Sequence, residues 1–548
     1  MKVAFAQLNY TIGDFDGNSS KIIQNIEKAK TEGADLVIFS ELSVTGYYPH
    51  DLLEKKEFIQ KAEDTVLKIA AHCIEIAAVI GAPRINENER GKKLYNSAFF
   101  LADGKVQQVQ NKTLLPTYDI FDEYRHFEPN RFFDVIQFKG ERIALTICED
   151  LWDEQPTANE FGKDKLYQVS PMEELSKLNP DFVINISASP FSYNQEDWRK
   201  NVLINKAIKY NVPIFYVNQI GAQTELIFDG GSVFINNDGE IVKELKYFEE
   251  DFLLVDTNNI GKKELQPSSN TTEKIHDALI LGIRDYFRKM GFSKATLGLS
   301  GGIDSAVTVV LAVRALGAEN VRVLLMPSKY SSDHSVEDAR QLAENLKIRY
   351  DIINIQSVVD KFNEALTPLF AGTVPDVTEE NIQARARGIY VMAVSNKFGH
   401  ILLNTTNKSE SAVGYGTLYG DMNGGLAVLG DVYKTDVFKL SRFMNKDGEI
   451  IPENTIVKPP SAELRPDQKD TDSLPEYDTL DKILFNYIEL NKSPKEIVAN
   501  GFDEAMVNKV IRMVNMNEYK RFQAAPILRV SSKAFGFGRK IPLVAKYD

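Results

Sequence analysis

Three segments in the first half of the chain carry a chemically capable residue where an apolar run ends. Cys148 follows the run 142–147 in LTICEDLW, Glu41 follows another in VIFSELSVTGY, and Lys112 follows a third in QNKTLLPTYDIFDE. In α/β folds, chemistry is placed where strands end and loops begin. A cysteine nucleophile needs its thiolate formed and the protons of its leaving group managed. These three residues are therefore candidates for one catalytic site.

Other interpretations of the cysteines stay open at this point. A lone buried cysteine is usually a packing residue, and Cys73, in the helical stretch KIAAHCIEIAA, is expected in the core. A histidine is the other common partner of a catalytic cysteine. The chain has six histidines, and His126 in EYRHFEP is not excluded by its type.

The second half contains the segment LGLSGGIDSAV, in which a strand pattern passes into a helix pattern. Gly301 and Gly302 allow a tight turn and a close approach of the backbone to a ligand. The helix that follows directs its first N–H groups at that ligand and favours an anion. The loop lacks the lysine of a Walker A motif. Asp304 would repel phosphate unless a divalent cation lay between them, so the loop predicts a metal-bound pyrophosphate.

Short apolar segments alternate with amphipathic helices on both sides of a polar stretch at 258–272, NNIGKKELQPSSNTT, which is typical of a linker. The class is therefore α/β, and the strand–helix alternation after the linker predicts a parallel sheet. Strands are expected at 3–8, 35–39, 77–81, 97–101, 143–147, 181–186, 213–217, 232–235, 295–299, 321–326, 351–355 and 400–404, and helices at 18–33, 57–73, 306–316, 335–346 and 383–397, with further helices from about 470.

Composition excludes several functional classes. The 548 residues carry 64 Lys plus Arg and 77 Asp plus Glu, a formal charge of −13, which argues against a nucleic-acid partner. Two cysteines are too few for a disulfide scaffold and predict a reducing compartment, the cytoplasm. The start MKVAFAQLNY lacks the apolar region of a signal peptide. The sequence contains no run of about 18 apolar residues, so we expect no membrane span.

The first half resembles the nitrilase superfamily in the three segments above and in AFAQLN, YNSAFF (95–100) and NISASPF (185–191). The resemblance implies an α-β-β-α sandwich over residues 1–258 with glutamine amidohydrolase activity. In the logic of that family, Glu41 takes the thiol proton and passes it to departing ammonia, Cys148 forms a thioester, and Lys112 stabilises the oxyanion. The family's glutamine-binding positions correspond to Tyr118, Ser189 and Gln195.

The second half resembles the ATP pyrophosphatase (PP-loop) superfamily in SGGIDS. Within it, the NAD synthetases are matched by MPSKYSSDHS (326–335), ENIQARARG (380–388), LLNTTNKSE (402–410), GYGTLYGDM (414–422) and GDVYKT (430–435). The resemblance implies a Rossmann-like domain over residues 273–548, after a linker at 259–272, with Mg²⁺ and ATP. Lys408 is expected, by type, to neutralise charge on the transferred phosphate. The residues implied are Gly298, Leu299, Ser300, Gly301, Gly302, Ile303, Asp304, Ser305 and Thr405 for ATP, Asp304 and Glu410 for the metal, and Asn381, Glu410 and Lys520 for deamido-NAD⁺.

Together the two resemblances are those of the glutamine-dependent NAD⁺ synthetases. They imply an enzyme, assembled as a homo-oligomer, that makes NAD⁺, AMP, pyrophosphate and glutamate from deamido-NAD⁺, ATP and L-glutamine. Other PP-loop amidotransferases fit less well, because residue 2 is lysine, no Gly-x-Cys-x-Gly elbow surrounds Cys148, and no cysteine follows it. The alternative from another class is a nucleotide-sensing binding protein with an inactive amidase domain. The intact set of acidic and basic residues argues against it.

Overall fold

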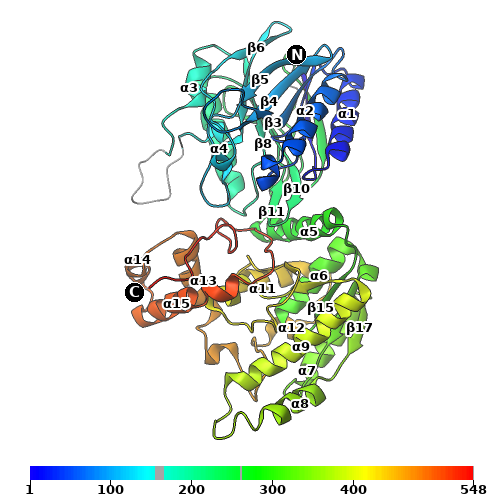
Figure 1. Cartoon of the computed structure of the whole chain (residues 1–548), viewed down its shortest axis with the longest axis vertical. Coiled ribbons are helices and arrows are strands. Elements are labelled where there is room, and N and C mark those ends of the chain that lie inside the picture. Colours follow the sequence, from blue (N-terminus) through cyan, green and yellow to red (C-terminus); the bar gives the residue numbers. More distant parts are fainter. Residues whose placement is uncertain (155–165, 260–261, 547–548) are drawn as a thin grey trace. The chain divides into compact units, whose positions relative to one another are not determined.

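The computed structural model describes residues 1–154, 166–259 and 262–546, and it divides the chain into two compact units, Met1–Ser268 and Ser269–Asp548 (Figure 1). The division lies inside the range 259–272 assigned to the linker, and the first helix of the second unit begins at Thr271. Within the described part of the chain, no helix is long and apolar enough to cross a membrane.

The first unit is built on two six-stranded sheets packed face to face. Val3, Phe5 and Phe100 of one sheet meet Leu145 and Phe215 of the other in a common buried core. The first sheet runs β14 (Asp251–Asp256), β1 (Lys2–Gln7), β2 (Leu36–Ile38), β3 (Ala77–Ile85), β4 (Leu94–Ala102), β5 (Lys105–Asn111), and the second runs β13 (Ile241–Glu244), β12 (Val233–Ile235), β9 (Ile214–Asn218), β8 (Phe182–Ser187), β7 (Glu141–Ile147), β6 (Val135–Phe138).

Helices cover the outer face of each sheet. Apolar side chains of α1 (Phe15–Thr31) and α2 (Lys56–Ala70) pack on the first sheet, and those of α3 (Pro171–Ser176) and α4 (Gln195–Tyr210) pack on the second (Figure 1). This confirms the α-β-β-α sandwich. A two-stranded ribbon, β10 (Ile220–Gln223) with β11 (Leu226–Asp229), and the short turns η1 (His50–Glu54), η2 (Glu123–Arg125) and η3 (Cys148–Leu151) complete the unit.

Several sequence-based assignments need correction in this unit. The expected helix at 57–73 ends at Ala70, so Cys73 lies in the turn before β3, although it is fully buried as predicted. The strands β5, β6, β10, β11, β13 and β14 were not predicted. Most of them lie at sheet edges or carry polar residues, as in KVQQVQN of β5, and therefore lack a continuous apolar signal.

The second unit holds a five-stranded sheet in which all neighbours are parallel, as predicted. The strands run β17 (Arg349–Ile352), β16 (Val321–Leu325), β15 (Ala295–Gly298), β18 (Ile401–Asn404), β19 (Leu426–Ala427). Because the chain order reverses between β15 and β18, the loops after these two strands open a crevice at their carboxyl ends. The SGGIDS loop follows the first of them, and Thr405 follows the second.

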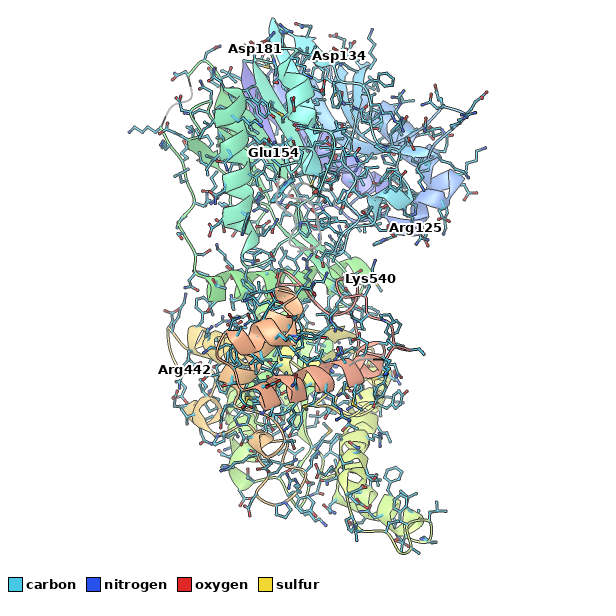
Figure 2. All side chains as sticks on the ribbon, turned by 90° about the vertical axis from the view of Figure 1, so that its left-hand side faces the viewer. Arg125, Asp134, Glu154, Asp181, Arg442 and Lys540 are labelled. Atoms are coloured by element: carbon cyan, nitrogen blue, oxygen red, sulfur yellow. The ribbon has the colours of Figure 1, made fainter. Side chains whose placement is uncertain are left out.

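The helices and short turns of this unit surround the sheet and extend beyond it towards the C-terminus (Figures 1 and 2). They are α5 (Thr271–Met290), α6 (Ile303–Leu316), η4 (Ala318–Asn320), α7 (Asp333–Asn345), α8 (Gln356–Leu366), α9 (Val377–Phe398), α10 (Lys408–Val413), α11 (Lys434–Met444), α12 (Glu453–Val457), η5 (Asp470–Asp472), α13 (Tyr477–Leu484), the π turn η6 (Phe485–Glu489), α14 (Pro494–Ala499), α15 (Glu504–Met516) and α16 (Glu518–Arg521).

Candidate active sites

The first unit buries Glu41 and Lys112 against each other, as the sequence predicts. Lys112 Nζ lies 2.7 Å from Glu41 Oε1 and 2.8 Å from Oε1 of Glu123, a residue that the sequence analysis did not single out. All three side chains are almost fully buried. Burial opposes the Lys112 charge, but Glu123 and Glu41 outweigh it and raise the Lys112 pKa well above its usual value. Lys112 is therefore a permanent cation held between two carboxylates.

Further hydrogen bonds fix the direction in which each carboxylate points. Glu41 accepts one from Asn96 Nδ2 at 2.7 Å and one from the backbone N–H of Ala188 at 3.0 Å. Glu123 accepts one from the Tyr47 hydroxyl at 2.8 Å. Burial raises the pKa of Glu123 to about 7, with Lys112 acting in the opposite direction.

Cys148 lies where β7 ends, at the first residue of η3, and belongs to the same buried group. Its φ is +44°, in the left-handed region that non-glycine residues adopt at a cost of about 1–3 kcal/mol. The backbone therefore leaves the extended conformation of β7 at this residue. Burial raises the pKa of Cys148 well above its usual value, and Glu41 raises it further while Lys112 lowers it. The side chain is therefore a thiol at neutral pH and needs a base to react.

Asp150 ties the Cys148 turn to the segment that follows Lys112. It accepts hydrogen bonds from the backbone N–H groups of Thr113, Leu114 and Ile147 at 3.0, 2.8 and 3.0 Å. Three donors from two segments therefore converge on one carboxylate. Asp150 thus positions the cysteine relative to the lysine.

Glu149, directly after the cysteine, is a third buried carboxylate, after Glu123 and Asp150, that the sequence did not assign to the site. It accepts hydrogen bonds from the Tyr118 hydroxyl at 2.9 Å and from the Tyr167 hydroxyl at 2.8 Å. Burial raises its pKa, and the two hydroxyls act against that rise. The predicted Tyr118 thus lies next to the Cys148 turn, with its ring partly exposed.

The other two residues predicted to bind glutamine flank β8 and α4. Ser189 is buried just after β8 and donates its backbone N–H to Asn218 Oδ1 at 2.9 Å. Ala188, the residue before it, is the one that donates to Glu41. Gln195 is the first residue of α4 and is partly exposed.

The strand ends of the second unit surround a cavity of about 650 Å³. Eight of the nine residues predicted for ATP line it: Gly298, Leu299, Ser300, Gly302, Ile303, Asp304, Ser305 and Thr405. The ninth, Gly301, has a φ of +78°, and a Cβ there would lie 2.2 Å from the backbone oxygen of Ser335. Glycine is therefore required at this position so that the loop can pack against the start of α7.

Within this cavity, the carboxylates of Asp304 and Glu410 both lie close to the ammonium group of Lys434. Lys434 Nζ lies 2.5 Å from Asp304 Oδ2 and 3.1 Å from Glu410 Oε1, and Asn407 Nδ2 donates to Asp304 Oδ1 at 2.8 Å. Burial raises the pKa of Glu410 to about 8, while Lys434 acts to lower it. The donor set of two hard carboxylates beside a phosphate loop suits Mg²⁺, so these residues fit the metal that the resemblance implies.

Three other predicted residues, Lys408, Lys520 and Asn381, do not line this cavity. Lys408 lies in the interior, 2.9 Å from both Asp431 Oδ1 and Glu489 Oε1, so its predicted phosphate role is wrong. Lys520 Nζ donates to the carbonyl oxygens of Gly414 and Gly416 at 2.7 and 2.8 Å, and Asn381 Oδ1 accepts from Thr417 Oγ1 at 2.7 Å. Neither Lys520 nor Asn381 lines the cavity, while Glu410 does.

Arg387 is a cation of the cavity that the sequence analysis quoted within a motif but did not assign. It lines the cavity, and its Nε donates to the backbone oxygen of Met326 at 3.1 Å. Burial lowers its pKa to about 10, so it remains charged at neutral pH. Lys434 and Glu123 likewise lie inside quoted motifs, GDVYKT and QNKTLLPTYDIFDE, so motif membership was the available signal.

Comparisons with known proteins agree with two separate sites, because a different family model matches each half of the chain. The family model described as carbon-nitrogen hydrolase matches residues 2–259, and the one described as NAD synthase matches residues 275–524. The chain is 45% identical to a glutamine-dependent NAD(+) synthetase of Synechocystis sp., over 100% of this chain and 99% of the relative. The corresponding protein of Thermotoga maritima is 41% identical, over 100% and 99%.

Solved structures give the same result. That of the glutamine-dependent NAD+ synthetase from Acinetobacter baumannii, in complex with adenosine diphosphate, is 40% identical with a TM-score of 0.78, over 99% of this chain and 98% of that one. A glutamine-dependent NAD(+) synthetase from Cytophaga hutchinsonii is 21% identical with a TM-score of 0.83, over 100% and 98%, which is a likeness of fold.

Proposed function

The chain belongs to the family of glutamine-dependent NAD(+) synthetases, and we propose that its two units divide that reaction between them. It is an enzyme that uses ATP to amidate deamido-NAD⁺ with nitrogen from glutamine. One observation carries the proposed division: the buried cysteine with its carboxylate and lysine lies in one unit, and the phosphate-loop cavity lies in the other.

In the first unit, Glu41 removes the proton of Cys148, and the thiolate attacks the side-chain amide carbon of glutamine. Lys112 faces the developing oxyanion, where a fixed charge stabilises the transition state. Glu41 then returns the proton to the nitrogen, ammonia departs, and water hydrolyses the thioester to glutamate and free thiol. The raised pKa of Cys148 supports a mechanism in which the base is required for attack.

The same unit offers polar groups for the α-ammonium and the α-carboxylate of glutamine. Glu149 is a buried carboxylate next to the nucleophile, and Tyr118 donates to it, so we assign this pair to the α-ammonium group. Ser189 and Gln195 are assigned to the α-carboxylate, because their hydroxyl and amide groups can donate hydrogen bonds to it. Glu149 directly follows Cys148, and Ser189 directly follows Ala188, which donates to Glu41, whereas Gln195 is assigned on its chemistry alone.

In the second unit, the 298–305 loop and Thr405 bind the phosphates and nucleoside of ATP, and Asp304 and Glu410 would hold Mg²⁺. When bound, the ion supplies charge neutralisation at the phosphate oxygens. Lys434 and Arg387 add cationic groups to the same cavity, facing the pyrophosphate that leaves. Asn381, Glu410 and Lys520 are assigned to deamido-NAD⁺. Asn381 and Lys520 hold the 414–417 segment, in which Tyr415 lines the cavity.

The second unit forms the amide in two steps. A carboxylate oxygen of the nicotinate ring attacks the α-phosphorus of ATP, and pyrophosphate leaves. Ammonia attacks the adenylated carbonyl carbon, AMP leaves, and a proton is released. We also propose that the enzyme is a homo-oligomer, which only the resemblance implies. We place it in the cytoplasm, which the two cysteines support, with no membrane partner and with no nucleic-acid partner, which the acidic composition supports.

The deciding experiment follows NAD⁺ formation from deamido-NAD⁺, ATP and Mg²⁺ with either glutamine or ammonium as the nitrogen source. Cys148→Ala is expected to lose the glutamine-driven rate by about 10⁴-fold or more and to keep the ammonium-driven rate. Cys73→Ala is the matched control, because Cys73 is the other buried thiol and is expected to keep both rates. A wild-type protein that makes NAD⁺ from neither source would refute the assignment.

A further inference from the structure

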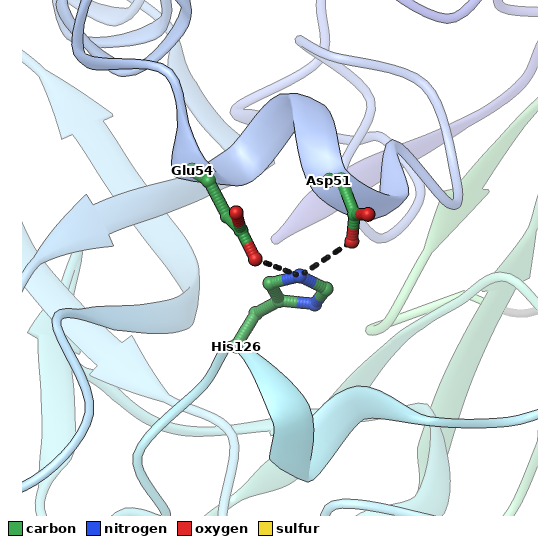
Figure 3. A group of neighbouring side chains, drawn as sticks. All are labelled: Asp51, Glu54 and His126. Atoms are coloured by element: carbon green, nitrogen blue, oxygen red, sulfur yellow. Dashed lines mark ion pairs between the residues drawn. The ribbon is translucent and has the colours of Figure 1, made fainter.

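A group of three side chains in the first unit takes no part in the proposed reaction (Figure 3). Asp51 and Glu54 lie on η1, three residues apart, and His126 follows η2. One potential ligand atom from each lies within 4.8 Å of the other two, and these residues form the one such group in the described part of the chain. Residues three apart on a 3₁₀ turn point the same way, so both carboxylates face the imidazole.

The imidazole of His126 is buried and oriented from one side. Its Nδ1 shares a hydrogen bond of 2.7 Å with the Tyr48 hydroxyl, and the residue is 8% exposed. Its Nε2 has no hydrogen-bond partner among the described residues, although it is shielded from solvent. A buried ring nitrogen without a partner is costly, so it points to a ligand in the direction that it faces.

The distances around Nε2 suit a shared cation better than direct hydrogen bonds. Nε2 lies 3.5 Å from Asp51 Oδ1 and 3.8 Å from Glu54 Oε1, longer than good hydrogen bonds. Two ligands bound to Zn²⁺ at about 2.1 Å and at the tetrahedral angle are about 3.4 Å apart. Both distances from Nε2 are therefore within a few tenths of an ångström of that separation, and the two carboxylates are exposed side chains.

The chemistry of the three ligands also indicates which ion they suit. One imidazole nitrogen with two carboxylate oxygens is typical of zinc and its neighbours among the divalent transition metals, whereas Mg²⁺ prefers oxygen alone. The Tyr48 hydroxyl on Nδ1 is the kind of outer-shell partner that fixes the orientation of a metal-binding histidine. Three protein ligands leave a fourth position for water.

We propose that Asp51, Glu54 and His126 form a binding site for a divalent transition-metal ion of the Zn²⁺ class, joining η1 to η2. Arg125, labelled in Figure 2, lies 3.0 Å from Asp51 Oδ1 and offsets part of the negative charge. The site is therefore weaker than a structural zinc site with uncompensated ligands. An occupied site restrains η2, which begins at Glu123, the partner of Lys112.

The test is a calorimetric titration of the full-length protein with Zn²⁺ in excess Mg²⁺. Cys148→Ala serves as the parent protein, because it lacks the thiol that could bind zinc. The excess Mg²⁺ competes with Zn²⁺ for the carboxylates of Asp304 and Glu410. His126→Gln and Glu54→Gln each remove one ligand from the parent. His72→Gln is the matched control, because His72 is an exposed histidine 3.9 Å from Glu27.

The parent is expected to bind one equivalent of Zn²⁺, and each ligand variant is expected to bind it at least about 10-fold more weakly. The His72 variant should bind it like the parent. Glu54 is exposed, so its variant tests the site even if the buried His126 variant misfolds. The proposal is overturned if the parent shows no saturable binding, or if Glu54→Gln binds Zn²⁺ as tightly as the parent. None of these results depends on turnover, so they stand apart from the assignment of the reaction.

Discussion

Glu123→Gln changes the charge of the buried glutaminase group without changing its shape. Glu123 accepts hydrogen bonds from Lys112 at 2.8 Å and from Tyr47 at 2.8 Å, and the amide oxygen of glutamine can accept both. Lys112 keeps its other carboxylate, Glu41, at 2.7 Å. The positive charge then acts on Glu41 alone and stabilises its ionised form. Glu41 becomes a poorer proton acceptor, and Lys112 is held less firmly.

The size of this effect follows from the difference between charged and neutral hydrogen bonds. A bond to a charged group contributes about 1.5–3 kcal/mol and a neutral one about 0.5–1.5 kcal/mol, so the charge contributes about 1–1.5 kcal/mol. At 1.36 kcal/mol for each factor of ten, the glutamine-driven kcat/KM is expected to fall about 5- to 13-fold. The fall stays well below the loss for Cys148→Ala, because Glu41 and Lys112 both remain.

The assay measures glutamate release and NAD⁺ formation from glutamine, together with NAD⁺ formation from ammonium. Asp153→Asn is the matched control. Lys206, like Lys112, is a buried lysine with two carboxylates, Asp153 at 2.6 Å and Glu154 at 2.8 Å, and it lies outside the cysteine group. Asp153→Asn should lower the free energy of unfolding by about as much as Glu123→Gln does and leave the glutamine-driven rate unchanged.

Two outcomes would contradict the proposed role of Glu123. An unchanged glutamine-driven kcat/KM in Glu123→Gln would show that the second carboxylate does not support the first. An equal fall in the ammonium-driven rate would show a general loss of structure, since no residue of the second unit is altered.

Three further predictions concern pH and two lysines. Burial raises the pKa of Glu123 to about 7, so its carboxylate gains a proton as the pH falls through 7. The glutamine-driven kcat/KM of the wild type should therefore fall between pH 8 and pH 6. The pH profile of Glu123→Gln should lack this fall. Lys434→Met should lower NAD⁺ formation from both nitrogen sources by about 10²- to 10³-fold while glutamate release persists, measured in parallel assays, because it removes the cation between Asp304 and Glu410. Lys408→Met should lower the free energy of unfolding by about 3–5 kcal/mol in a denaturant titration, because two buried carboxylates lose their cation; an unchanged midpoint would contradict the burial argument.

Apolar runs define strands, so the sequence was enough to predict the α/β class and the parallel sheet of the second unit. Glu41, Lys112 and Cys148 each stand at the end of such a run, which made them candidates, and the resemblance to the nitrilase superfamily implied their roles. The glycine loop 298–302 and Asp304 are visible for a similar reason, since local backbone requirements dictate the residue types there. Edge strands such as β5 and β6 were missed, because polar residues interrupt the apolar pattern that marks a strand.

The pairing of charged residues that lie far apart in the chain became known from the folded structure alone. Lys408 and Lys434 are both lysines of short motifs, yet the first is enclosed by Asp431 and Glu489, and the second joins Asp304 to Glu410. In the sequence, Glu123 is likewise one of several acidic residues. Only in the fold does its Oε1 lie 2.8 Å from Lys112 Nζ. Burial and pairing depend on distance in space, and residue type along the chain does not contain that information.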